Sequence, residues 1–285
     1  MLPLFIICNN NSEIINGTFF HVYELGLYLQ DRGVDVYFIT VKSDKDFYSI
    51  RYTKTLKKIT LKNYTEHIIK KYNVLAYNIY NDYQFYQILK KAQNIYHLIT
   101  DGSLYCFQSC KNKWESRSLE YIKRIQFLYD VDLPNPIENE KIFMKNTKHK
   151  CSWGIYDKYY RITHEECNDY FIYARHNDNR MEGILTYSNT NKVEEAIQYC
   201  EENNISYVLD TKKCFNPWNK YKGLIYTRNI DYSPRLPFEF GIANKHTICF
   251  DTSPGLRTLA EDCSLYKPII MKTRKKLSLP LELFQ

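Results

Sequence analysis

The fold of this chain is decided by its opening residues, Leu2–Val41, which read LPLFIICNNNSEIINGTFFHVYELGLYLQDRGVDVYFITV. Leu2–Cys8 is a continuous apolar run, typical of a parallel strand buried on both faces, and a polar loop, Asn9–Gly17, follows it. From Thr18 apolar residues recur on one helical face, and Val34–Val41 is a second strand. Two parallel strands joined by a helix form a right-handed βαβ unit, and such units bind ligands at the carboxyl edge of the sheet.

The alternation of strands and helices continues through the first half of the chain. The apolar patterns predict strands over Thr55–Leu61, Val74–Ile79 and Ile95–Thr100, and helices over Tyr64–Lys71 and Tyr83–Lys91. The stretch Asp130–Arg161 shows no regular pattern and carries Pro134 and Pro136. We therefore place a domain boundary near the end of this stretch.

A second α/β series follows the boundary. It predicts strands over Tyr170–Ala174, Ser206–Leu209 and Gly223–Thr227. Between the first two, Asn191 and Glu194 form an N-cap and capping-box pair for a helix that Asn203-Asn204 ends. The sequence thus predicts an α/β protein with two Rossmann-like doubly wound domains, residues 1–162 and 163–285, that face a cleft.

The composition describes a globular, moderately basic protein. The 285 residues exceed the usual size of a single core, the hydrophobic content is 44%, and the net charge of +7 favours anionic partners. The nine cysteines lack paired or zinc-binding spacing, so we expect reduced thiols, a cytoplasmic location and no bound metal. The N-terminal apolar run is too short for a signal peptide and no apolar span of about 18 residues occurs, so we expect a soluble protein without a membrane span.

One late stretch, Ser233–Ile248, combines residues that suit a nucleotide diphosphate. Ser233-Pro234-Arg235-Leu236 opens a predicted helix that leads into a β-rich run ending at Asp251. A helix N-terminus offers free N–H groups to phosphate oxygens, Arg235 can bind phosphate in a fork, and Glu239 can accept from ribose hydroxyls. The alternative is an ordinary turn between strand and helix with an arginine on the surface.

The order of these elements resembles the two-domain GT-B glycosyltransferases, and among them the DNA β-glucosyltransferases of T-even bacteriophages. The residues that carry the resemblance are Gly17-Thr18, Tyr96–Leu104 (YHLITDGSL), Ile172–Arg180 (IYARHNDNR), and Arg235–Glu239 followed by Asp251. Similar elements occur in the same order over most of the chain, and it is this order that gives the resemblance.

The resemblance implies roles for individual residues. Asp101 would be the catalytic base that takes the proton of the acceptor hydroxyl; its alternative role is a turn, because Asp-Gly is a common turn pair. Gly17, Thr18, Arg175, Arg180, Arg235 and Glu239 would bind the donor, with Glu261 as the rival of Glu239 for the ribose. Residues 1–162 would be the acceptor domain and residues 163–285 the nucleotide-sugar donor domain.

The acceptor is suggested by basic residues interleaved with aromatic ones. Between Gln108 and Arg124 lie Lys111, Lys113, Trp114 and Arg117, which would contact a phosphate backbone and an extruded base. A similar mixture occurs over Lys141–Arg161. The alternative for both stretches is a solvated face beside core aromatics.

We therefore expect a monomeric transferase that moves a sugar from a nucleotide sugar, taken to be a UDP-sugar, to a modified base in DNA. A loosely bound Mg²⁺ or Mn²⁺ ion on the diphosphate is left open. Two alternatives remain: a GT-B enzyme with a glycan, lipid or protein acceptor, and a nucleotide- or sugar-binding protein without catalysis.

Overall fold

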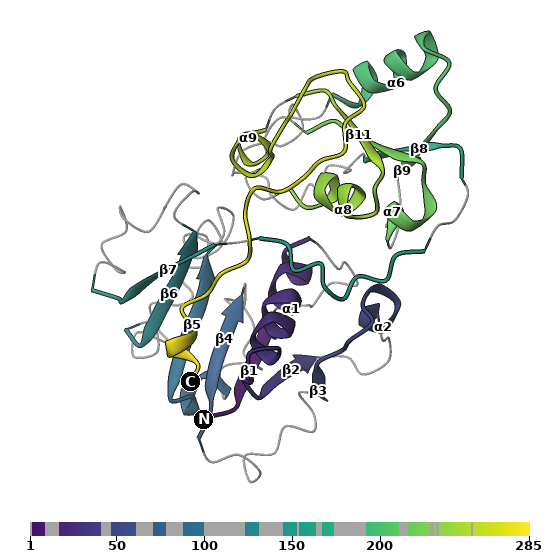
Figure 1. Ribbon diagram of the computed structural model, residues 1–285. Coiled ribbons are helices and arrows are strands. Elements are labelled where there is room, and N and C mark those ends of the chain that lie inside the picture. Colours follow the sequence, from purple (N-terminus) through teal and green to yellow (C-terminus); the bar gives the residue numbers. More distant parts are fainter. Residues whose placement is uncertain are drawn as a thin grey trace. The chain divides into compact units, whose positions relative to one another are not determined.

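A computed structural model describes most of the chain as two units of parallel α/β structure (Figure 1). Unit 1 comprises Met1–Tyr159 and Lys276–Gln285, and unit 2 comprises Tyr160–Lys275. The described residues are 2–8, 17–40, 47–60, 71–77, 88–99, 123–130, 145–152, 154–163, 167–173, 192–210, 216–228, 231, 234–251 and 253–285.

Unit 1 is built on a seven-stranded sheet in the order β3-β2-β1-β4-β5-β6-β7, with every neighbouring pair parallel. The order reverses between β1 and β4, as in doubly wound sheets that bind ligands at the carboxyl ends of their strands. The strands are β1 (Leu4–Cys8), β2 (Val36–Thr40), β3 (Lys57–Thr60), β4 (Asn73–Tyr77), β5 (Asn94–Ile99), β6 (Ile125–Asp130) and β7 (Lys148–Cys151).

The core of unit 1 explains why the apolar runs form these strands. All five residues of β1 are buried, and side chains on one face, among them Phe5 and Ile7, join a core cluster with residues of β4, β5 and β6. Helix α1 (Gly17–Gln30) packs on β1 and β2 through Phe19 and Tyr23, whose rings contact Phe38 of β2. A short helix, α2 (Phe47–Arg51), also belongs to this unit.

Unit 2 holds a four-stranded parallel sheet in the order β11-β10-β8-β9. Its strands are β8 (Tyr170–Tyr173), β9 (Tyr207–Asp210), β10 (Gly223–Tyr226) and β11 (His246–Cys249). Its helices are α6 (Val193–Glu202), α7 (Pro217–Lys220), α8 (Leu236–Ile242) and α9 (Pro254–Leu259). Ala196 and Cys200 of α6 pack on Ile172, Ile225 and Ile248, which come from three neighbouring strands. Both units therefore confirm the predicted α/β class with parallel sheets.

The last ten residues, Lys276–Gln285, belong to unit 1 and not to a domain spanning 163–285. Ser278 pairs with Ser152 through two backbone hydrogen bonds. The hydroxyl of Tyr96 on β5 donates to the carbonyl of Leu283 at 2.9 Å, and the ring of Phe284 lies 4.9 Å from that of Tyr96. The first crossing between the units lies between Tyr159 and Tyr160, three residues before the predicted boundary.

Several local expectations need correction. The stretch Asp130–Arg161, expected to be irregular, contains β7, and β6, α2 and α7 were not expected. The N-cap of α6 is Lys192, without a side-chain cap hydrogen bond, in place of Asn191, which lies outside the described residues. The predicted helix Tyr64–Lys71 lies outside them almost entirely, whereas Asn203 ends α6 as expected.

Candidate functional site

Most residues predicted to act on substrate lie outside the part of the chain that the structure describes. They are Asp101, Lys111, Lys113, Trp114, Arg117, Arg175 and Arg180. The strands that lead to two of them are described: β5 ends at Ile99, two residues before Asp101, and β8 ends at Tyr173, two residues before Arg175. Both residues thus follow the carboxyl end of a parallel strand in the sequence.

The carboxyl edge of the unit 1 sheet combines a helix N-terminus with the end of β5. Helix α1 begins at Gly17, after β1 has ended at Cys8, so its first N–H groups, which have no partner within the helix, lie at this edge. In the sheet, β4 separates β1 from β5, so the ends of β1 and β5 lie about 10 Å apart. Thr18 is the second residue of α1, and its side chain is outside the described part.

In unit 2 the predicted Arg235 and Glu239 come together, but as partners of each other. Arg235 is the N-cap residue of α8, and its Nε donates to Oε1 of Glu239, one turn later, at 2.9 Å. Both side chains are about 4% exposed. The pair is therefore a buried ion pair at the start of the helix.

The hydroxyl of Tyr160 completes this cluster. It accepts from the guanidinium of Arg235 at 2.6 Å and contacts Oε1 of Glu239 at 3.4 Å, while its ring stacks on Trp218 of α7 at 5.8 Å. Asn219 of α7 binds the same segment, since its side chain accepts from the N–H of Thr163 and donates to the carbonyl of Arg161. In the structure, the Arg235–Glu239 pair thus helps to hold the segment by which the chain enters unit 2.

This structural role was missed by the sequence reasoning. The spacing of four residues on one helix face was a signal for an ion pair between Arg235 and Glu239, but their burial depends on Tyr160, 75 residues earlier in the chain. Glu261, the rival for the ribose, is exposed, and Asp251 is half-buried at the end of the β-rich run. The donor-binding roles of these residues stay predictions.

A second polar cluster stands in unit 1, around Asp31 at the end of α1. Its carboxylate accepts from Lys54 at 2.6 Å, from Lys158 at 2.8 Å, and from the hydroxyls of Tyr156 and Tyr159. Burial by itself would raise the pKa of Asp31, but these four hydrogen bonds together hold the pKa well below its usual value. The cluster binds the segment 154–159 to α1, so its shifted pKa has a structural cause.

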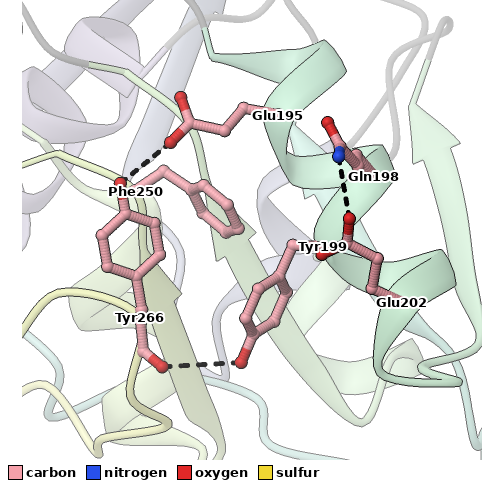
Figure 2. Close-up of a pocket in the computed structure, with 6 residues that line it drawn as sticks. All are labelled: Glu195, Gln198, Tyr199, Glu202, Phe250 and Tyr266. Carbon is pink, nitrogen blue, oxygen red and sulfur yellow. Dashed lines mark hydrogen bonds between the residues drawn. The ribbon is translucent and has the colours of Figure 1, made fainter.

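Unit 2 also has an open pocket of about 210 Å³ beside α6 (Figure 2). It is lined by Glu195, Gln198, Tyr199, Glu202, Phe250 and Tyr266. The ring of Phe250 meets those of Tyr199 and Tyr266 edge-on, at 5.3 and 5.2 Å. Tyr266, in the left-handed backbone region at φ 57°, donates from its hydroxyl to Glu195 at 2.9 Å. Of the predicted donor residues that the structure describes, Gly17, Arg235 and Glu239, none lines this pocket.

The described residues show no group of three or more His, Cys, Asp or Glu side chains that could hold a metal ion. Six cysteines are described, and four of them are buried. Burial raises the pKa of the Cys200 thiol to about 11. Of the helices in the described ranges, none has the length and apolar character needed to cross a membrane.

No family model matches this chain, and no curated protein sequence matches it. Among solved structures, the chain is similar to the crystal structure of T4 phage BGT in complex with its UDP-glucose substrate. The match has a TM-score of 0.49 and 12% sequence identity, and it covers 90% of this chain and 83% of that chain. A likeness at this level does not assign the chain to a family.

Proposed function

We propose that the chain is a glycosyltransferase that moves a sugar from a nucleotide sugar to an acceptor hydroxyl. One observation carries the proposal: a candidate base and a candidate phosphate ligand each follow the end of a parallel strand, one in each unit. Asp101 stands two residues after β5, and Arg175 stands two residues after β8. Ligands of doubly wound sheets bind at such strand ends.

The proposed reaction is a direct displacement at the anomeric carbon. Asp101 accepts the proton of the acceptor hydroxyl as its oxygen forms the new glycosidic bond. The bond between the sugar and the diphosphate breaks, and the nucleotide leaves with the electron pair. Arg175 and Arg180 neutralise the charge that develops on this leaving group, and the N–H groups at Gly17 and Thr18 bind anionic oxygens at the start of α1.

For Arg235 and Glu239, binding of the donor requires a rearrangement of the structure. To contact the phosphate and ribose of a donor, the two side chains must exchange a buried ion pair for contacts with the ligand. Glu261 is exposed and needs no such exchange, which keeps it as the rival ribose ligand. A UDP-sugar is the proposed donor, with a loosely bound Mg²⁺ or Mn²⁺ ion on the diphosphate left open.

The proposed acceptor is a hydroxymethylated or similar base in DNA. Its support is the net charge of +7 and the basic and aromatic stretch that contains Lys111, Lys113, Trp114 and Arg117. A base must leave the stack before an enzyme can reach its hydroxyl, and aromatic rings beside cations suit an extruded base. A glycan, lipid or protein acceptor is the alternative within the same chemistry.

Mass spectrometry of products tests the proposal. The chain is incubated with UDP-sugars and, in separate reactions, with hydroxymethylated DNA, unmodified DNA and a panel of glycans and peptides. A hexose mass added to the modified DNA alone is the expected result. Transfer to another acceptor would reject DNA, whereas donor binding without any transfer would reject the enzyme and leave a binding protein.

A calorimetric titration tests the donor site separately. Arg175→Ala should weaken the binding of UDP-glucose by roughly 1.5–3 kcal/mol, the worth of a hydrogen bond to a charged group. Unchanged donor affinity in this variant would show that the phosphate assignment is wrong.

A further inference from the structure

Basic side chains form a row along the amino-terminal edge of half of the unit 1 sheet. They stand in the turns that lead into β4, β5, β6 and β7, four strands that are successive neighbours in the sheet. All are exposed, and we call them the amino-edge row: Lys71, Lys90, Lys91, Lys123, Arg124 and Lys145. Neighbouring strands lie about 4.8 Å apart, so the row extends over about 14 Å.

The described residues of the four turns, 71–73, 88–94, 123–125 and 145–147, include no aspartate or glutamate. The other half of the same edge is different, because Asp35 pairs with Lys57 and Asp31 binds both Lys54 and Lys158. The carboxylate of Glu282, in the C-terminal segment of unit 1, interacts electrostatically with His149 of β7. Among the described residues, the net positive charge of this edge is therefore greater on the half formed by β4, β5, β6 and β7.

Hydrogen bonds join these turns to one another. The N–H of Gln93 donates to the carbonyl of Tyr72 at 2.8 Å, and the side chain of Asn94 donates to that of Asn73 at 3.0 Å. Arg124 donates to the carbonyls of Lys90, at 3.2 Å, and Ala92. On the far side, Asn146 donates to the carbonyl of Ile125 at 2.7 Å. Hydrogen bonds therefore connect each of the four turns that carry the row to the next one.

We propose that the amino-edge row binds the phosphate backbone of a nucleic acid. A line of cations with amide and hydroxyl groups between them offers the contacts that position a protein on phosphates without reading sequence. A membrane surface is less well matched, since none of the exposed large hydrophobic residues of the described chain (Ile50, Val208, Leu265 and Tyr266) lies in these turns. The row stands at the opposite edge of the sheet from the carboxyl end of β5, which Asp101 follows in the sequence, and the inference does not depend on sugar transfer.

The test uses the full chain and a fluorescein-labelled DNA duplex without modified bases, with fluorescence anisotropy measured over a series of KCl concentrations. One variant combines Lys71→Gln, Lys123→Gln and Lys145→Gln. A control variant with the same change in net charge combines Lys222→Gln, Lys267→Gln and Lys272→Gln, three exposed positions in unit 2. For the row variant, the slope of log K against log salt should fall by about 2–3, because each phosphate contact contributes about 0.9. The control variant should keep a slope close to that of the wild type.

Equal losses in the two variants would overturn the proposal, because binding would then follow net charge alone. Absence of DNA binding by the wild-type chain at low salt would overturn it as well. So would binding to phosphatidylserine vesicles that the row variant loses while its DNA binding is unchanged. Calorimetry with UDP-glucose on the same variants keeps the two proposals apart, since neutralising the row should leave donor affinity unchanged.

Discussion

Replacement of Glu239 by glutamine should destabilise unit 2 because it leaves the guanidinium of Arg235 buried without its counter-charge. Both side chains are about 4% exposed and their atoms lie 2.9 Å apart. Breaking a buried ion pair by removing one charge costs about 3–5 kcal/mol. Glutamine retains an oxygen that can accept from Arg235, and Tyr160 still accepts from it. We therefore expect the lower end of this range, about 3 kcal/mol.

Hydrogen–deuterium exchange read by mass spectrometry measures this loss within unit 2 alone, which global unfolding of a two-unit chain does not. Amides of α8 and of residues 160–163 should exchange about 100-fold faster in Glu239→Gln, because each 1.4 kcal/mol corresponds to a factor of ten. Glu261→Gln is the matched control, since Glu261 is exposed. Its amides should exchange at the wild-type rate.

A double-mutant cycle measures the interaction energy between Arg235 and Glu239 separately from the effect of removing each charge alone. Arg235→Met combined with Glu239→Leu removes both charges, and apolar replacements of a buried pair are often nearly neutral. The double variant should therefore be more protected than either single variant. If Glu239→Gln kept wild-type protection while its affinity for UDP-glucose fell, Glu239 would be a ligand of the donor and our account of a structural pair would be wrong.

Two further predictions concern stability. Burial lowers the pKa of His97 to about 3, although a backbone hydrogen bond at Leu98 acts in the opposite direction and has the smaller effect. Below pH 6.5 the unfolded chain therefore binds a proton that the folded chain does not. The free energy of unfolding should then fall by about 2 kcal/mol between pH 7 and pH 5. In urea titrations of His97→Leu, the free energy of unfolding should depend less on pH. An unchanged pH dependence in this variant would contradict the low pKa of His97. Gly241→Ala should cost unit 2 stability at the upper end of about 1–3 kcal/mol, because an added Cβ would lie 1.9 Å from the carbonyl oxygen of Met271. At Gly33, where nothing lies within 4 Å but φ is +85°, alanine should cost only roughly 1 kcal/mol; equal losses at the two sites in thermal unfolding would refute this reasoning.

Strand β1, which is buried on both faces, is one of the strands that the sequence predicted well. The run Leu2–Cys8 became β1, with all five of its residues buried. The helix predicted from Thr18 became α1, which begins one residue earlier. A continuous apolar run or a helical face is a property of neighbouring residues, so it can be read locally.

Two of the elements that the sequence did not predict, β7 and α2, depend on residues far away in the chain. The edge strand β7 has the sequence Lys-His-Lys-Cys, of which only Cys151 is buried, and among the described strands it pairs only with β6. Charged edge strands of this kind discourage unwanted pairing and carry little apolar signal. The five-residue α2 also depends on a residue distant in the sequence, because the ring of its Tyr48 stacks on that of Tyr23 in α1, with the ring centroids 4.0 Å apart.

In the candidate site, too, some features could be predicted from neighbouring residues and others depend on residues far away in the chain. The sequence placed Asp101 and Arg175 directly after strands, and the ends of those strands, Ile99 and Tyr173, lie within one residue of their predicted positions. It also marked Arg235 and Glu239 as a pair of interest. It could not show that these two side chains are buried together, because this depends on Tyr160 and on the packing of α7.

The central claim, sugar transfer with Asp101 as base, is tested most directly by single-turnover transfer in Asp101→Asn. The control is Asp35→Asn, an exposed aspartate that precedes β2 and pairs with Lys57. Loss of a general base should slow transfer by about 10²–10⁴-fold, with UDP-glucose affinity unchanged, while Asp35→Asn transfers at the wild-type rate. Wild-type transfer by Asp101→Asn would contradict the account.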